Sequence, residues 1–333
     1  MSESKLSTAE AELYDRQIRL WGIESQEKLR AANVLLIKIR GLGSEIAKDI
    51  LLCGINSLTI LDDALVTEEE IFKNFLLSPE SVGKNIAEAV LEKAQALNPL
   101  VKITPDSESV DKKNAEFFAI FTVVIATGLN SVQVLEISKY CRDAKVKFIC
   151  GDNFGMFGYS FADFQTHEFF EDKVQLTGGQ KRGIDGRITK VKSERTVVKV
   201  CGKMEYVDLS KVIKLPEAPM KPKRRNIYYY LMLALLQFRD KFNRDPMMES
   251  KEEDVKELKA IKDDILKLYQ VNPDKFKEEV FDLIFGEVVP VCSIVGGVMA
   301  QEAIKAVSGK EVPINNVFLL DPFNYSGREE NVV

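Results

Sequence analysis

The sequence predicts an α/β protein built on a Rossmann-like, doubly wound sheet. Three observations support this class. Short apolar runs alternate with segments of helical periodicity through the first half of the chain. The first apolar run ends in the two-glycine turn Gly41-Leu42-Gly43, and Asp62 closes the second run. Parallel strands joined by crossover helices produce this alternation, and ligands of such sheets bind beyond the carboxyl ends of the strands.

The elements predicted for the first half follow each other as strands and helices. They are strands over 34–39, 57–62, 101–104, 121–126 and 146–150, and helices over 44–53, 82–97 and 131–143. Each strand is a short, mostly apolar run, as expected when both faces of a sheet are covered. The second helix stops at Asn98-Pro99, because proline lacks the amide hydrogen and restricts the residue before it.

The second half departs from this pattern and then returns to it. Residues 151–164 predict continued strand or a hairpin, and 177–192, rich in Gly, Lys and Arg, predict a mobile loop. Predicted helices follow over 226–242, 252–269, 273–285 and 293–307, and 316–321 predict a late strand that joins the first sheet. We therefore expect one Rossmann-like domain made of 1–165 and 281–333. Residues 166–280 would be an insertion carrying the mobile loop (about 175–200) and helices.

Composition excludes several classes of function. The 333 residues carry a net charge of −5, which argues against a nucleic-acid binder. The chain lacks a long uncharged apolar run and an N-terminal signal core, so neither a membrane span nor secretion is expected. A single histidine, His167, and the absence of any Cys-x-x-Cys pair argue against a metal site.

The glycine turn and Asp62 form a candidate nucleotide site. Backbone amides at the start of a helix hold phosphate, and a carboxylate after the next strand holds a ribose. Such turns also occur for packing reasons, so this pattern alone leaves both interpretations open. Lys38 and Arg40 stand where a phosphate-binding turn requires small residues. The stem of Lys38 would occupy space that the nucleotide needs.

Residues 14–22, Tyr-Asp-Arg-Gln-Ile-Arg-Leu-Trp-Gly, hold the only tryptophan and two arginines just ahead of the first strand. A cationic element in this place could serve the phosphates of its own fold, those of a neighbouring subunit, or neither. Taken alone, the segment is best interpreted as a solvated Arg16 beside a Trp21 that packs a helix.

Five motifs in order along the chain resemble the ubiquitin-like-protein activating enzymes, a family that includes bacterial MoeB and ThiF. They are residues 14–22, Gly-Leu-Gly-Ser-Glu-Ile-Ala-Lys (41–48), Ser-Val-Gly-Lys-Asn-Ile-Ala-Glu-Ala (81–89), Gly-Asp-Asn-Phe-Gly-Met-Phe-Gly-Tyr (151–159) and Pro-Val-Cys-Ser-Ile-Val-Gly-Gly-Val-Met-Ala-Gln-Glu (290–302). The likeness fails only around 175–200. It is strongest to the smaller, non-catalytic subunits of the heterodimeric members that activate SUMO.

Active members of this family adenylate the C-terminal glycine of a small modifier with ATP and Mg²⁺ and pass it to a cysteine. The resemblance implies that this chain has lost the groups for that step. Of the family's site, only Gly41, Gly43 and Asp62 remain. The degenerate positions are Lys38 and Arg40 in the glycine motif, Ala64 in Asp-x-Asp, Lys73 in Asn-Arg-Gln-Phe, Ile86 for the nucleotide lysine and Leu129 for the metal-binding aspartate. Isoleucine and leucine supply neither cation nor metal ligand, so we expect this half-site to be inactive.

The resemblance also implies a role for the N-terminal segment. In the family, the arginine that matches Arg16 reaches across the dimer to the phosphates in the partner's active site. The chain would then be a regulatory subunit whose catalytic partner binds ATP and Mg²⁺, with SUMO bound through the complex. Arg19 would form an interface or intrahelical salt bridge.

Cys292 and a basic segment carry further expectations. Cys292 is expected to pack a helix and not to accept the modifier, and 221–225, Lys-Pro-Lys-Arg-Arg, are equally a nuclear-import signal or a basic helix flank. We expect the chain in the nucleus, with some in the cytoplasm. One alternative is the corresponding subunit for the cullin-modifying ubiquitin-like protein. Another is an NAD-dependent oxidoreductase, which Ile46 at the third glycine position and His167 in an expected loop both disfavour.

Overall fold

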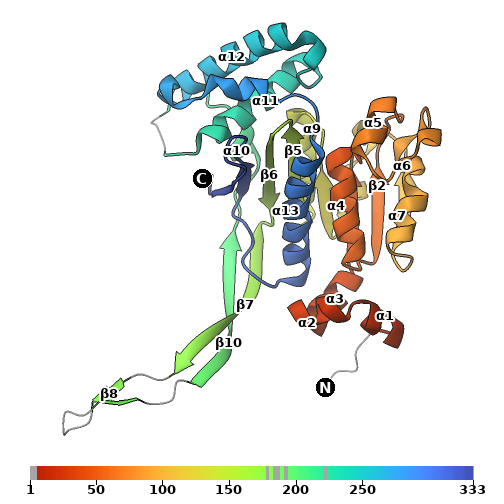
Figure 1. The fold of residues 1–333 in the computed structure, drawn as a ribbon, viewed down its shortest axis with the longest axis vertical. Helices are drawn as coiled ribbons and strands as arrows, with labels where there is room; N and C mark the ends of the chain where they lie inside the picture. The colour runs from red at the N-terminus through yellow and green to blue at the C-terminus, as the bar shows by residue number, and fades with distance from the viewer. Residues whose placement is uncertain (1–5, 178–179, 183–187, 191–193, 221–223, 333) are drawn as a thin grey trace.

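The computed structural model describes residues 6–177, 180–182, 188–190, 194–220 and 224–332. Its centre is an eight-stranded sheet in the order β12-β11-β6-β5-β4-β1-β2-β3 (Figure 1). The strands are β1 (Asn33–Ile37), β2 (Ser57–Leu61), β3 (Lys102–Asp106), β4 (Val123–Ala126), β5 (Lys147–Phe154), β6 (Phe157–Asp163), β11 (Val317–Leu320) and β12 (Gly327–Glu330). β3, β2, β1, β4 and β5 are parallel, while β6, β11 and β12 continue the sheet antiparallel. The predicted Rossmann-like sheet, including its late strand, is confirmed.

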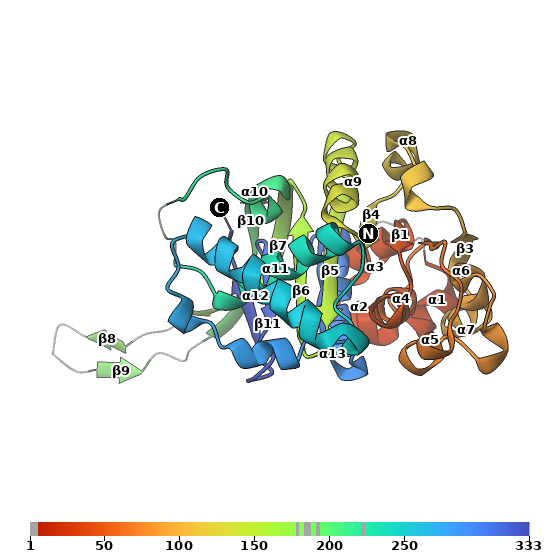
Figure 2. The same cartoon turned by 90° about the horizontal axis from the view of Figure 1, so that it is seen from above.

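Alternate side chains of the central strands enter two separate cores. On β1, Val34 and Leu36 belong to one core, and Leu35 and Ile37 to the other. Helices α4 (Gly41–Leu52), α7 (Leu91–Leu97) and α13 (Val289–Ser308) cover the first core, and α8 (Ala115–Ala119), α9 (Ser131–Asp143) and α11 (Ile227–Phe242) cover the second (Figure 2). Helices on both faces explain why the central strands β1 and β4 are apolar almost throughout.

The helix predicted over 82–97 begins later than expected. Residues before Asn85 form a turn in which Gly83 has a φ of 82°. The Asn85 side chain accepts from the Glu88 amide and caps α6 (Ile86–Ala89), which passes into α7. Its amide group also donates to the Asp62 carbonyl at 2.8 Å. The residues before Asn85 are therefore fixed against the end of β2.

The segment 273–285 was expected to be helical and is not one regular helix. It forms two 3₁₀ turns, Pro273–Lys275 and Glu278–Asp282. Phe276 and Phe281 are buried and stack with a ring-centre distance of 5.6 Å. Anchoring both rings in the core takes precedence over a continuous helix.

α13 is long and apolar enough to cross a membrane by length and composition alone. In the structure it packs against α4, β5 and β6, and 56% of its apolar window is buried inside the protein. A Cβ on Gly296 would lie 3.0 Å from the Cβ of Glu45. The glycine thus allows close helix contact, as expected for a core helix.

The insertion begins with a long two-stranded ribbon where the sequence predicted a loop over about 175–200. β7 (Thr166–Thr177) pairs with β10 (Glu194–Glu205) along its whole length, followed outward by the short strands β8 (Gln180–Arg182) and β9 (Ile188–Lys190). Within that predicted loop, residues 175–177, 180–182, 188–190 and 194–200 are in these strands, so the loop prediction is wrong for them. Residues 178–179, 183–187 and 191–193 of the predicted loop lie outside the described residues.

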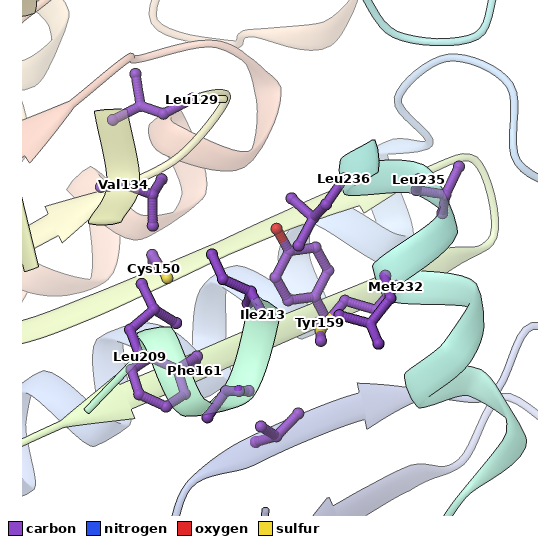
Figure 3. Packing of buried hydrophobic residues seen from close by; sticks show 14 of the residues in the cluster. Leu129, Val134, Cys150, Tyr159, Phe161, Leu209, Ile213, Met232, Leu235 and Leu236 are labelled. Atoms are coloured by element: carbon purple, nitrogen blue, oxygen red, sulfur yellow. The ribbon is translucent and has the colours of Figure 1, made fainter. Parts of the chain in front are cut away.

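The helical part of the insertion packs on the sheet. α10 (Ser210–Ile213) and α11 lie over β5 and β6, where Met232 and Leu236 approach Tyr159 (Figure 3). Most of α11 is buried, whereas α12 (Lys251–Leu268), packed against it, keeps a charged outer face. The inserted helices and the sheet therefore share one core.

Candidate functional site

The glycine turn joins β1 to α4 at the carboxyl end of the sheet. β1 ends at Ile37 because Lys38 adopts a φ of 66°, and α4 starts at Gly41, three residues earlier than predicted. A Cβ on Gly43 would lie 2.3 Å from the Lys38 carbonyl oxygen. Gly43 is thus required for the close approach of helix and strand, whether or not a phosphate binds.

Asp62, the carboxylate expected to hold a ribose, is already fully engaged. Its Oδ1 lies 3.2 Å from the Lys38 ammonium and accepts from the Ala64 amide at 3.1 Å, while Oδ2 accepts from the Ile39 amide at 2.8 Å. Lys38 also pairs with Asp63. Burial alone would lower the pKa of Lys38, but the two aspartates outweigh it and raise that pKa. Lys38 therefore takes the place of a ligand at Asp62.

The start of α4, where a phosphate would bind, holds a carboxylate of the chain itself. Glu287 Oε1 accepts from the Leu42 amide at 3.4 Å, and its Oε2 would lie 3.2 Å from a Cβ on Gly41. The Gly155 amide donates to the Gly286 carbonyl at 2.7 Å, which fixes the segment. Helix N-termini attract anions, and Glu287 meets that preference. Sequence reasoning missed Glu287, since only the fold brings it to this helix.

The loop after β4 is closed by a buried ionic network. Arg239 donates to the Leu129 carbonyl at 2.9 Å, pairs with Asp152 at 2.6 Å and with Asp245 at 2.6 Å. Asp152 in turn accepts from the Gly128 amide at 2.9 Å. Burial raises the pKa of Asp152 against the opposing effect of Arg239. The Leu129 side chain itself is in the core, where it offers nothing to a metal ion.

The remaining degenerate positions surround the same turn. Ile86 is buried in the core beside α4. Arg40 is half-exposed, with its guanidinium 4.0 Å from Glu70. Lys73 pairs with a glutamate of its own helix, α5 (Glu68–Lys73). The buried Asn74 then donates to the Ile39 carbonyl at 2.6 Å, so this segment closes over the turn.

Replacing Glu287 with glutamine is expected to increase the free energy of unfolding at neutral pH, on the order of 1 kcal/mol. Burial, then the neighbouring Glu70, raises the pKa of Glu287. A group with a raised folded-state pKa stabilises below its unfolded-state pKa and loses that contribution as pH rises through the folded-state value. The neutral amide can still accept from Leu42 without this loss.

Urea denaturation at about pH 5 and about pH 7.5 checks this, with the larger gain expected at the higher pH. Glu279→Gln, at an exposed position nearby, serves as control and should leave the free energy of unfolding unchanged. A Glu287→Gln protein with a smaller free energy of unfolding than the wild type at the higher pH would contradict the prediction.

The N-terminal helices lie at the opposite end of the sheet from the glycine turn (Figure 1). They are α1 (Thr8–Leu13), α2 (Asp15–Trp21) and α3 (Ile23–Arg30). Tyr14 is buried and its hydroxyl accepts from Asn98 at 2.9 Å. Trp21 donates to Gln26 at 3.0 Å, and Gln26 donates to the Cys53 carbonyl at 2.9 Å. The segment is thereby fixed to the C-terminal end of α4.

Arg16 is exposed on α2, and its guanidinium makes no hydrogen bond or ion pair with the residues that the structure describes. Arg19 pairs with Asp15 at 3.0 Å, which matches its expected salt bridge. α4, whose 12 residues span about 18 Å, lies between α2 and the glycine turn. Arg16 is therefore not part of this chain's own nucleotide-type site.

Comparison with known proteins identifies the family of this chain. The model of the ThiF family matches residues 14–332. The chain belongs to the ThiF family. This ThiF-family chain is 40% identical over 330 residues to SUMO-activating enzyme subunit 1 of Homo sapiens, covering 97% of this chain and 95% of that protein. The subunits of Bos taurus (39%, covering 97% and 95%) and Danio rerio (37%, covering 97% and 94%) are also similar.

The structure of E. coli MccB with MccA-N7isoASN shares the fold of this ThiF-family chain. Its TM-score is 0.55 at 12% identity, over 99% of this chain and 74% of that chain. Family membership also argues against the oxidoreductase alternative. The engagement of Asp62 by Lys38 agrees, since a dinucleotide-binding fold uses this carboxylate for the ribose.

The other residues singled out from the sequence are structural. Cys292 is buried, and burial raises the pKa of its thiol to about 12. His167, expected in a loop, is buried on β7, and its pKa falls to about 4 through burial. Within the described residues, no group of three or more His, Cys, Asp or Glu side chains could hold a metal ion. Of the basic segment 221–225, residues 221–223 lie outside the described part.

Proposed function

We propose that the chain is the regulatory subunit of a SUMO-activating enzyme and that Arg16 completes the ATP site of a catalytic partner subunit. Its strongest support is that Arg16 is exposed and makes no polar contact with the residues that the structure describes, on a helix at the far end of the sheet from the chain's own glycine turn. The similarity to SUMO-activating enzyme subunit 1 over nearly the full length of both chains supports the choice of modifier.

The residues around this chain's own turn do not fit ATP and Mg²⁺. A triphosphate needs cations and metal ligands, and the turn instead holds the Glu287 carboxylate, with Ile86 and Leu129 in the core. The carboxylate oxygens of Asp62 already bind Lys38 and two backbone amides. ATP and Mg²⁺ are therefore assigned to the partner subunit.

The chemistry of Arg16 suits a contribution in trans. A guanidinium is always charged and presents several donors that match phosphate oxygens. When a second subunit supplies it, the cation stabilises the charge of the transferring phosphates only in the assembled complex. Activity of the partner would then depend on heterodimer formation.

ATP–pyrophosphate exchange with SUMO tests the proposal. The purified chain alone should show no exchange above background, and adding the catalytic subunit of a SUMO-activating enzyme should produce it. Robust exchange by this chain alone would overturn the proposal. Pull-down with the catalytic subunits for SUMO and for the cullin-modifying protein separates the two modifiers, and we expect stable binding only to the former.

A further inference from the structure

The β7–β10 ribbon projects from the body of the protein (Figure 1). Thr166–Thr177 pairs with Glu194–Glu205 over a length of about 40 Å. Among the described residues, the sheet formed by β7 and β10 consists of these two strands. An isolated ribbon of two strands is at best marginally stable in water, and it exposes unpaired backbone groups along every edge that no other segment covers. Its outer part therefore needs other support.

The inner part of the ribbon is fixed to the body. The Phe170 amide donates to the Gly309 carbonyl at 2.8 Å, and the Glu311 amide donates to the Phe170 carbonyl at 2.8 Å. The ammonium groups of Lys28 and Lys199 lie 5.8 Å and 3.8 Å from the centre of the Phe170 ring. The ribbon thus leaves the body at a defined position next to α3.

Lys310 ties the ribbon to the helix that carries Arg16. Its ammonium group donates to the Leu20 carbonyl at the end of α2, at 3.2 Å, and lies 3.4 Å from Asp172 of β7. Lys199 of β10 lies 3.9 Å from Glu24 of α3. The surface of α2 and α3 therefore continues directly onto the ribbon.

Beyond these contacts the ribbon presents apolar side chains to solvent. Val174 and Val197 stand opposite each other in the ladder and are 61% and 66% exposed. Residues two apart on a strand share a face, so Val174 and Val197 lie on the same face of the ribbon as Phe170 and Lys199. Leu20, on α2, is 67% exposed as well. This exposed apolar pair on an open ribbon offers a contact surface to another molecule.

We propose that the outer part of the ribbon is an arm that packs against the catalytic partner subunit. This inference rests on the proposed function, because a partner that receives Arg16 must lie against α2. A partner that packs against α2 also reaches the ribbon, since Lys310 contacts both α2 and β7. The valine pair supplies apolar contact, and the open strand edges can donate and accept backbone hydrogen bonds.

The test is the affinity of the full-length chain for the catalytic subunit, measured by calorimetry. The double variant Val174→Asp/Val197→Asp should raise the dissociation constant at least tenfold. Val132→Asp, at a position on α9 that is 72% exposed, is the matched control and should stay within twofold. Exchange activity at saturating catalytic subunit should be retained by all of them, since none touches Arg16.

A second variant guards against misfolding of the double variant. Residues 174–197 are replaced with Asn-Gly, which closes the ladder at the pair Lys173 and Val198 with a two-residue hairpin turn. The same loss of affinity is expected. Unchanged affinity of both variants for the catalytic subunit would overturn the proposal that the ribbon packs against it. A raised KM for SUMO at unchanged heterodimer affinity would also overturn it, because the ribbon would then contact the modifier. Failure of the Arg16 role would appear separately, as Arg16→Ala exchange equal to wild type.

Discussion

Replacing Arg16 with alanine is expected to slow SUMO adenylation by the assembled heterodimer about 10³-fold, the lower end of the effect of arginines supplied in trans. The exposed guanidinium would be lost from the partner's triphosphate, where charge develops during the reaction. Arg16→Lys should recover only part of the rate, because an ammonium cannot make the same planar set of hydrogen bonds. ATP–pyrophosphate exchange at saturating partner measures both.

Two controls separate this effect from assembly. Arg19→Ala removes an exposed arginine of the same helix that pairs with Asp15, and it should leave the exchange rate within twofold. Arg16→Ala should keep the stability of the chain, because Arg16 makes no polar contact within the described residues. An exchange rate equal to wild type in a fully assembled complex would refute the role of Arg16.

Replacing Arg239 with alanine is expected to lower the free energy of unfolding by about 3–5 kcal/mol. The Arg239 side chain is only 7% exposed, and its removal leaves Asp152 buried without a cation. The Leu129 carbonyl loses its donor as well. Because burial already raises the pKa of Asp152, the uncompensated carboxylate is costly. Urea denaturation at neutral pH measures the loss.

The control for this loss lies on the same helix. Lys241 pairs with Glu257 at 2.7 Å, but 55% of its side chain is exposed, so Lys241→Ala should cost about 1 kcal/mol or less. The double variant Arg239→Met/Asp152→Asn, which buries no charge, should recover part of the stability lost in Arg239→Ala. An Arg239→Ala protein within 1 kcal/mol of Lys241→Ala would show that the network contributes little.

Local sequence signals predicted most of the central fold. Mostly apolar runs located the central parallel strands β1, β2 and β4, because a strand covered on both faces is largely apolar. The predicted bounds of α9 match the structure, in which Asn130 caps its first turn. The glycine-bearing helix near Gly296 was also predicted, although not its start at Val289.

The errors fall where distant residues decide local structure. The start of the helix predicted over 82–97 was displaced by hydrogen bonds between Asn85 and the end of β2. Residues of about 175–200, rich in glycine and basic residues, were predicted to form a loop, but 175–177 at the end of β7 pair with 194–196 at the start of β10. Neither cross-strand pairing nor packing of Phe276 and Phe281 is visible in one short window.

The sequence alone determined the family-type fold, the retained Gly41, Gly43 and Asp62, and the candidate Arg16, because these depend on residue type and order. Only the tertiary structure decided how the vestigial site is filled. Glu287 lies 245 residues from Leu42, and no periodicity predicts that its carboxylate reaches the start of α4. The same holds for Arg16, whose distance from the glycine turn follows from the direction of α4 across the sheet.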